Sequence, residues 1–324
     1  MLNFKKIFFE LNAILVGILF GFIPIFVAIL RDKGVSSTEQ ISVRLLISFS
    51  LGILILIYYL IKEKHKFLES YTFSVQKYYL LQGLMITAMA FTYISSVVVG
   101  TPAGEAALLD QIHPVVTFVL AIFLLNERPT TKKTLSLGFA LIGVFILVRP
   151  WQLNSFFKYF FGDILALMSG TFYSFYIIIG RYFSKDSMRK KIDSKLSISW
   201  IFVWALITAF PIILILIQIH SFPAITEFKV NKVLQTEILI FILGLAIVGN
   251  IIPYLLLMVV SKFVESSKTS ILVLSEPLSA VLFGVIILSE PFTFEYLVGG
   301  GLLILGIMNI LRKSDYIISG EEIK

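Results

Sequence analysis

The sequence is dominated by long apolar segments that are separated by short polar stretches. An α-helix rises about 1.5 Å per residue, so about 20 apolar residues span the roughly 30 Å hydrocarbon core of a bilayer. Such segments are predicted at residues 7–30, 41–61, 77–99, 103–125, 130–148, 161–182, 196–218, 236–260, 267–288 and 294–311. The sequence therefore predicts an all-α integral membrane protein with ten transmembrane helices.

The composition excludes an ordinary soluble protein. Hydrophobic residues make up 58% of the chain, charged residues make up 15%, and the mean hydropathy is +0.94. We expect no soluble domain between or after the spans. The first apolar segment is too long for the core of a signal peptide and lacks a small-residue cleavage site, so we expect it to remain as the first span.

The sequence also lacks the patterns of several kinds of chemical site. It contains no cysteine, which excludes disulfides, thiolate chemistry and cysteine-bound metals. It contains neither a phosphate-binding G-x-x-x-x-G-K-S/T loop nor an H-E-x-x-H zinc motif. We therefore expect no cofactor, no metal site and no nucleic-acid partner. The expected partners are membrane lipid and a small-molecule substrate.

The net charge of +7 follows a pattern of membrane topology. If the N-terminus is inside, the inside segments hold 20 of the 27 Lys and Arg residues, half of them at 62–77 and 181–195. Positive residues concentrate on the cytoplasmic side of a membrane protein. Both termini are therefore predicted to be cytoplasmic, and the expected location is a prokaryotic inner membrane.

An internal repeat determines the predicted architecture. When the numbering is shifted by 163, residues 111–150 align with 274–313 without a gap and share seven identities. The identities are Pro114/Pro277, Leu125/Leu288, Glu127/Glu290, Thr130/Thr293, Gly138/Gly301, Gly143/Gly306 and Arg149/Arg312. Each half holds an odd number of spans, so the halves have opposite orientations. The prediction is two inverted five-helix repeats, at residues 7–148 and 161–312.

Ionisable residues interrupt the apolar span 103–125, where Glu105, Asp110 and His113 occur. A charged group near the centre of a membrane helix costs about 2.5–3.5 kcal/mol on insertion scales, so it usually faces protein or water. At about 100° per residue, Asp110, His113 and Thr117 fall within an arc of about 60°. We interpret this arc as one polar wall of a substrate cavity. The alternative is a hydrogen-bond network that holds helices together.

The second repeat offers a comparable group of polar residues. Glu276 occupies the repeat position of His113, and Thr269 and Ser279 lie within about 80° of it on a helix. An acid near the middle of a membrane span is expected to face the protein interior rather than lipid. We therefore place Glu276, Thr269 and Ser279 in the candidate site.

Polar residues in two further spans complete the predicted cavity wall. Tyr173 and Tyr176 share one face of their helix near mid-depth, so we expect their rings to line the cavity, although a packed or lipid-facing position fits the spacing nearly as well. Asn250 precedes Pro253, which frees a backbone carbonyl one turn back. Asn250 is expected either at a hinge that faces the cavity or at a plain kink.

Three other charged residues are expected to have structural roles. Glu127 should stabilise the N-terminus of the helix 130–148, and Glu290 should do the same for the helix 294–311. Arg44 lies near the start of the second span, and we expect its side chain to extend to the outer interface.

The two repeat units carry a resemblance to a known family. Their sequences are Pro114…Leu125-Asn126-Glu127-Arg128-Pro129-Thr130 and Glu276-Pro277…Leu288-Ser289-Glu290-Pro291-Phe292-Thr293, each followed by a pair of glycines. Over nearly its whole length the chain resembles the EamA-type branch of the drug/metabolite transporter superfamily. The resemblance implies a secondary transporter of small metabolites, such as amino acids or nucleosides, with a central cavity between inverted halves. Asp110 and His113 match no family-wide motif, so their assignment rests on their chemistry.

Together these patterns predict a transporter, not an enzyme, that moves a small polar or zwitterionic metabolite by alternating access. Glu276 is the preferred site of proton exchange because it has no basic neighbour within a turn, whereas Asp110 has His113. Two alternatives come from other classes: an intramembrane enzyme with Asp110 and His113 as an acid/base pair, and a ligand-sensing receptor. The inverted repeat favours the transporter over the enzyme. The receptor is disfavoured because we expect no soluble output domain.

Overall fold

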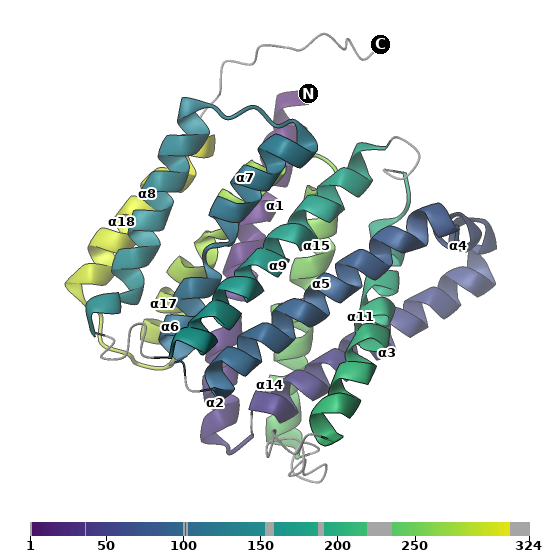
Figure 1. Cartoon of the computed structure of the whole chain (residues 1–324), viewed down its shortest axis with the longest axis horizontal. Coiled ribbons are helices and arrows are strands. Elements are labelled where there is room, and N and C mark those ends of the chain that lie inside the picture. The colour runs from purple at the N-terminus through teal and green to yellow at the C-terminus, as the bar shows by residue number, and fades with distance from the viewer. Residues whose placement is uncertain are drawn as a thin grey trace.

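The structure is a computed structural model that describes residues 2–35, 37–99, 101, 103–152, 159–186, 191–218 and 235–311. Within these ranges every regular element is a helix, and the helices form the bundle in Figure 1. The first half of the chain forms α1 (Leu2–Phe20), α2 (Phe22–Asp32), α3 (Ser37–Lys62), α4 (Lys64–Ser70), α5 (Phe73–Val98), α6 (Ala103–Asp110), α7 (His113–Leu125) and α8 (Thr131–Val148). The rest forms η1 (Pro150–Gln152), α9 (Phe160–Lys185), α11 (Ser194–Gln218), α14 (Thr236–Ala246), η2 (Ile247–Ile251), α15 (Ile252–Val260), α16 (Ser266–Val273), α17 (Ser275–Ile287) and α18 (Phe294–Leu311).

Eight helical segments of the described chain are long and apolar enough to cross a membrane, so the chain is an integral membrane protein. They are Ile7–Asp32, Glu105–Leu125, Thr131–Val148, Phe160–Lys185, Ser194–Pro211, Thr236–Val260, Ser266–Ile287 and Phe294–Leu311. The two remaining predicted spans, 41–61 and 77–99, lie in α3 and α5, which are 26 residues long each. The count of ten spans stays a prediction. Arg312 of the predicted repeat and residues 187–190 of the basic loop lie outside the described residues.

Four of the predicted spans are interrupted near their middle instead of being continuous helices. The interruptions lie at Gly21, at residues 111–112, at the π-helix η2 and at Leu274. Prolines follow two or three residues later, at Pro24, Pro114, Pro253 and Pro277. Proline lacks a backbone N–H and its ring clashes with the preceding turn, so the hydrogen-bond ladder of a continuous helix is broken there. The chain stays hydrogen-bonded there: the nitrogen of Gly21 donates to the oxygen of Gly17 at 2.9 Å, and that of Leu274 to the oxygen of Ile271 at 3.3 Å.

Two of the interruptions lie directly against a glycine of another helix. A Cβ added at Gly170 of α9 would lie 2.2 Å from the backbone oxygen of Asp110. A Cβ added at Gly17 of α1 would lie 2.5 Å from the oxygen of Val273 and 2.9 Å from the nitrogen of Glu276. Glycine allows the two backbones to approach this closely because it has no side chain. The break between α6 and α7 is therefore held against α9, and the break between α16 and α17 against α1.

Helices α8 and α18 pack side by side at one edge of the bundle along a row of small residues (Figure 1). A Cβ added at Gly143 would lie 2.7 Å from the backbone oxygen of Gly299. A Cβ added at Gly306 would lie 2.8 Å from the backbone oxygen of Ser136. In the repeat, which is offset by 163 residues, Gly143 is equivalent to Gly306 and Ser136 is equivalent to Gly299. From Ser136 to Gly143 along α8, the contacts on α18 therefore run backwards, from Gly306 to Gly299. The two helices are antiparallel, and each contact joins one position to the repeat equivalent of the other.

The two ends of the bundle have separate sets of contacts. We call the end where α1 begins and α18 ends, at the top of Figure 1, the terminal end. Near this end Glu10 of α1 forms an ion pair of 2.7 Å with Lys268 of α16. Lys185, the last residue of α9, donates a hydrogen bond to the carbonyl of Leu125, the last residue of α7. We call the other end, where α6 begins and α17 ends, the opposite end.

Candidate functional site

Two acidic side chains come together at the breaks of two interrupted spans. Asp110 is the last residue of α6, and Glu276 lies in the first turn of α17. The two carboxylates are close enough to interact electrostatically, and both residues are half-buried. They lie 166 residues apart in the sequence. The fold therefore joins the two acids in one place, a pairing that the sequence did not predict.

Three tyrosines from three other helices surround the acid pair. Tyr93 of α5 and Tyr254 of α15 each interact electrostatically with both Asp110 and Glu276. Tyr173 of α9 interacts with both acids as well. Tyr173 belongs to the predicted site, whereas Tyr93 and Tyr254 were missed. A tyrosine in an apolar span carries little signal of its own, because aromatic residues are common in membrane helices.

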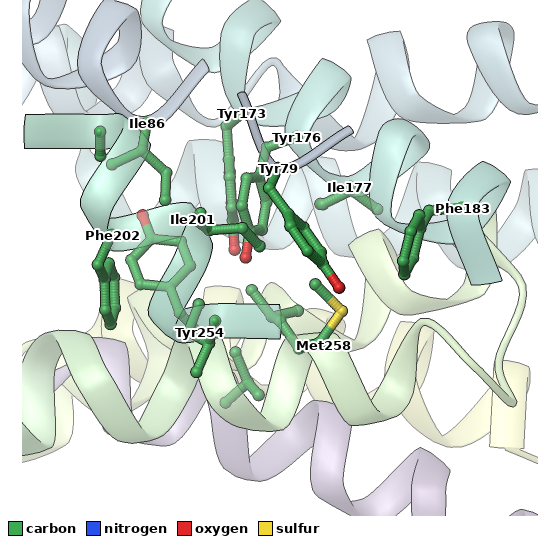
Figure 2. Close-up of a cluster of buried hydrophobic side chains, with 14 of the residues drawn as sticks. Tyr79, Ile86, Tyr173, Tyr176, Ile177, Phe183, Ile201, Phe202, Tyr254 and Met258 are labelled. Carbon is green, nitrogen blue, oxygen red and sulfur yellow. The ribbon is translucent and has the colours of Figure 1, made fainter. Parts of the chain in front are cut away.

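The rings of Tyr173 and Tyr254 belong to a buried cluster that also contains Tyr176 (Figure 2). The ring centroids of Tyr173 and Tyr176 lie 6.5 Å apart, and those of Tyr176 and Tyr254 lie 5.2 Å apart. Phe20 packs edge-on against Tyr254 at 5.5 Å. In Figure 2 the hydroxyls of Tyr173 and Tyr176 lie next to each other and point toward α15. Each such ring pair adds about 0.5–1.5 kcal/mol beyond burial, so the cluster holds these hydroxyls in place.

Polar atoms without partners concentrate in the same region. Enclosed atoms that have no hydrogen-bond partner among the described residues include Asp110 Oδ1, both ring nitrogens of His113, Thr117 Oγ1 and the hydroxyls of Tyr173 and Tyr176. Most buried polar groups in proteins are hydrogen-bonded, and an unpaired one costs about 1–3 kcal/mol. This group therefore offers several unused donors and acceptors to water or to a ligand.

Asp110 and His113 do not share one uninterrupted helix, and the prediction that both face a substrate cavity stays a prediction. The helix is broken between them, because Asp110 ends α6 and His113 begins α7 directly before Pro114. The ring of His113 packs edge-on against Tyr173, with the centroids 4.7 Å apart. Its backbone oxygen accepts a hydrogen bond of 2.9 Å from Ser174 of α9. The arrangement gives no hydrogen-bonded acid/base pair of the kind that an intramembrane enzyme would use.

Three predicted site residues use their polar groups in hydrogen bonds, between two helices for Asn250 and to the preceding turn for Thr269 and Ser279. Asn250, in η2, donates to the hydroxyl of Ser48 in α3 at 2.6 Å. The hydroxyls of Thr269 and Ser279 each donate to a backbone carbonyl three or four residues earlier, at 3.0 and 2.9 Å. Glu105 is buried in the first turn of α6, toward the opposite end. The acid pair and the tyrosines, rather than these residues, make up the centre of the site.

Arg44 reaches the tyrosine cluster instead of the membrane surface. Its guanidinium interacts electrostatically with Tyr254, and its Nε is enclosed and has no hydrogen-bond partner. The prediction of an interfacial side chain is wrong because α3 begins at Ser37, which places Arg44 about two turns inside the helix. A positive charge therefore lies beside the site.

A small cavity lies on the terminal side of the tyrosine cluster. Its volume is about 10 Å³, the size of one water molecule, and Tyr176, Ser266 and Thr269 are among the residues that line it. The hydroxyl of Ser266 is enclosed there without a hydrogen-bond partner. In this conformation the cavity admits nothing larger than water.

Glu127 binds a different helix from the one expected. The start of α8 is capped by Thr130, whose hydroxyl accepts from the nitrogen of Lys133 at 3.3 Å. Glu127 accepts hydrogen bonds from the backbone nitrogens of Ser266 at 2.7 Å and Ser267 at 3.1 Å, at the start of α16. It also accepts from the hydroxyl of Ser267. The prediction of a helix N-terminal acid was right in kind but wrong in the helix, because sequence proximity does not reveal a contact across the bundle.

In the described parts of the chain, no group of three or more His, Asp and Glu side chains is placed to hold a metal ion. The acids can accept hydrogen bonds or pair with a cation, and the tyrosine hydroxyls and the imidazole can donate or accept. A few convergent polar groups in an apolar surround are typical of sites for small organic molecules.

Comparison with known proteins adds a family and a fold. The model of the EamA-like transporter family matches two segments of the chain, residues 7–149 and 160–312. Two proteins of Archaeoglobus fulgidus, each described as an uncharacterized transporter, are 25% identical over 222 and 221 residues. These matches cover 68% of this chain and 72% and 70% of the relatives. A solved crystal structure covers 94% of this chain and 97% of its own, with a TM-score of 0.71 and 16% identity, so it shares the fold.

Proposed function

Because this chain belongs to the EamA-like transporter family and is a membrane transporter, we propose that it moves a small polar or zwitterionic metabolite by alternating access. The observation that carries this proposal is the pair of acids, Asp110 and Glu276, at the breaks of two interrupted spans. In transporters with repeated halves, interrupted helices form the substrate site near the middle of the membrane. Membership of a transporter family also argues against a catalytic role.

Alternating access is supported by signs of two equivalent halves. The family model matches the chain twice, and α8 and α18 contact each other through exchanged equivalent positions. We propose that the units 7–148 and 161–312 are inverted relative to each other. Two inverted units that share one site expose it first to one side of the membrane and then to the other when they exchange their two conformations.

The chemistry of the site favours a substrate that carries an ammonium group. Asp110 and Glu276 repel each other in an apolar interior unless a cation or a proton lies near them. The faces of the surrounding tyrosine rings also attract a cation. Arg44, beside Tyr254, supplies a partner for a carboxylate. A zwitterion such as an amino acid satisfies both kinds of group.

A binding screen tests this substrate class. Purified protein is mixed with zwitterionic metabolites, with their N-acetyl analogues and with their amides, and the thermal unfolding temperature is measured. A bound zwitterion is expected to raise this temperature by mass action, and an acetylated analogue, which lacks the ammonium group, is not. Asp110→Asn should remove the effect, whereas Glu69→Gln, which alters an exposed acid of α4, should keep it. Stabilisation only by compounds that lack an ammonium group would contradict the proposal.

The compounds that bind are then followed in sealed proteoliposomes with a radioactive label. Accumulation of the unchanged compound inside the vesicles supports transport. A chemically altered product would point to the enzyme alternative, and binding without uptake would point to a sensor.

A further inference from the structure

The hydrogen bonds between Glu127 and the start of α16 join the two segments that match the family. Glu127 belongs to the segment 7–149 and α16 to the segment 160–312. Glu127 is buried and accepts from the nitrogens of Ser266 and Ser267. We call these bonds, with the one from the Ser267 hydroxyl, the Glu127 cap. A carboxylate on the first N–H groups of a helix is a charge-assisted contact in the favourable direction of the helix dipole.

The repeat gives Glu127 an equivalent, Glu290, with the same local backbone. The residue before each acid has a left-handed conformation, with φ of 53° at Asn126 and 56° at Ser289. The nitrogen of Glu127 donates to the carbonyl six residues earlier at 3.0 Å, and the nitrogen of Glu290 does the same at 3.2 Å. The two acids are therefore presented by the same type of loop.

The equivalent of the Glu127 cap is not formed by Glu290. Shifted by 163, Ser266 and Ser267 become Ala103 and Gly104, the first two residues of α6. Glu290 is exposed, and its carboxylate lies over Gly284 of the preceding helix, α17. It has no side-chain hydrogen bond or ion pair with the described residues. Of two equivalent contacts, the structure contains one.

We propose that Glu127 and Glu290 are paired positioning residues for transport, and that their caps form alternately. In this conformation Glu127 closes the terminal end. In the other conformation Glu127 releases α16, and Glu290 accepts hydrogen bonds from the nitrogens of Ala103 and Gly104 to close the opposite end. This inference rests on the proposed alternating access, because it assigns the contact that holds each of the two states.

The burial of α16 agrees with this assignment, since every one of its residues is buried. In α6, Glu105 and Ala106 are buried and residues 107–110 are half-buried. Further contacts at the terminal end strengthen the closed state: Lys133 pairs with Glu265 at 3.0 Å, and Arg181 donates to the carbonyl of Ser261 at 2.9 Å. The acid pair therefore lies behind a closed terminal end.

Cysteine labelling tests the inference and needs no substrate. The native chain has no cysteine, so single cysteines report on one place each. Thr269→Cys lies in the fourth position of α16 and Ala106→Cys in the fourth position of α6, and the two positions are equivalent in the repeat. Both residues are buried in the structure. A membrane-impermeant thiol reagent is applied separately to right-side-out and inside-out vesicles, and the two labelling rates are measured.

Opposite changes are expected from the two matched variants. Glu127→Gln should raise the labelling of Thr269→Cys relative to Ala106→Cys by about tenfold, since it weakens charge-assisted hydrogen bonds in only one state. Glu290→Gln should lower the same ratio. Glu69→Gln, the exposed-acid control, should leave it unchanged. Shifts in the same direction, or no shift with Glu290→Gln, would overturn the proposal.

Glu290→Gln also keeps the test decisive if Glu127→Gln does not fold. Glu290 is exposed and forms no ion pair within the described part of the chain, so a purely structural role predicts no change in either labelling rate. Labelling that alternates as expected without any uptake of metabolites would support the caps while contradicting the proposed transport. Uptake without alternating labelling would contradict the caps alone.

Discussion

At the scale of single residues, the protein contains two kinds of buried polar group. Some are paired, as in the ion pair of Glu10 and Lys268. Others have no hydrogen-bond partner among the described residues, and several of these belong to Asp110, His113 and Tyr173. An unpaired buried group lowers stability, so a concentration of such groups is better explained by a ligand or a proton than by folding.

Glu276→Gln is expected to uncouple substrate uptake from a pH gradient across the membrane. Glutamine keeps the size of the side chain and its hydrogen bonding, but it cannot exchange a proton. In proteoliposomes, a pH gradient without a substrate gradient should drive accumulation by the native protein and not by Glu276→Gln. The exposed-acid variant Glu69→Gln should behave like the native protein. Indifference of the native protein to the pH gradient would exclude proton coupling and leave facilitated diffusion or another ion.

At the scale of helices, the interruptions determine where the two acids, Asp110 and Glu276, lie. The break between α6 and α7 lets Asp110 end a helix, and the break at Leu274 puts Glu276 in a first turn. Each break is held by a glycine of another helix, Gly170 or Gly17. The site therefore depends on close backbone contacts as well as on its own side chains.

Gly170→Ala is expected to lower stability and transport together. Its Cβ would lie 2.2 Å from the backbone oxygen of Asp110, so the helix break must move, at a cost of about 1–3 kcal/mol. Gly138→Ala is the matched control because no atom lies within 4 Å of an added Cβ there. The control should be neutral or stabilising by about 0.5–1 kcal/mol, since alanine favours a helix over glycine. Thermal unfolding and uptake are measured for both, and equal behaviour of the two variants would contradict the packing argument.

At the scale of the whole molecule, the chain forms one bundle in which the two family-matched segments are interleaved. Helix α1 packs on the break of α16 and α17, α9 packs on the break of α6 and α7, and α8 pairs with α18. Contacts between the segments occur at the terminal end through Glu127 and at the opposite end through Arg149, which donates to Tyr296 at 2.9 Å.

Both termini are expected on the cytoplasmic side. A single cysteine at Lys64, in the basic stretch 62–77, should resist an impermeant thiol reagent added to intact cells. A cysteine at Gln235, an exposed residue before α14 at the opposite end, is the matched control and should react. Labelling at Lys64 together with protection at Gln235 would reverse the orientation.

The sequence alone identifies the class of protein and predicts several residues of the candidate site. Length and hydropathy predict membrane helices because each helix satisfies its own backbone in lipid, which is a local property. The shift of 163 is visible because proline, glycine and charged residues stand out among apolar ones. Asp110, His113 and Glu276 are conspicuous for the same reason, since ionisable groups are costly in a membrane span.

The packing of the helices determines which of these residues meet. Tyr93, Tyr254 and Arg44 join the acids from three different helices, and no periodicity within one span reports a contact between spans. The partner of Glu127 lies 139 residues away. A prediction based on sequence proximity therefore placed Glu127 at the nearest helix N-terminus instead. The break between Asp110 and His113 follows from Pro114. Proline removes a helix bond wherever it occurs, but neighbouring helices settle whether the helix kinks or ends.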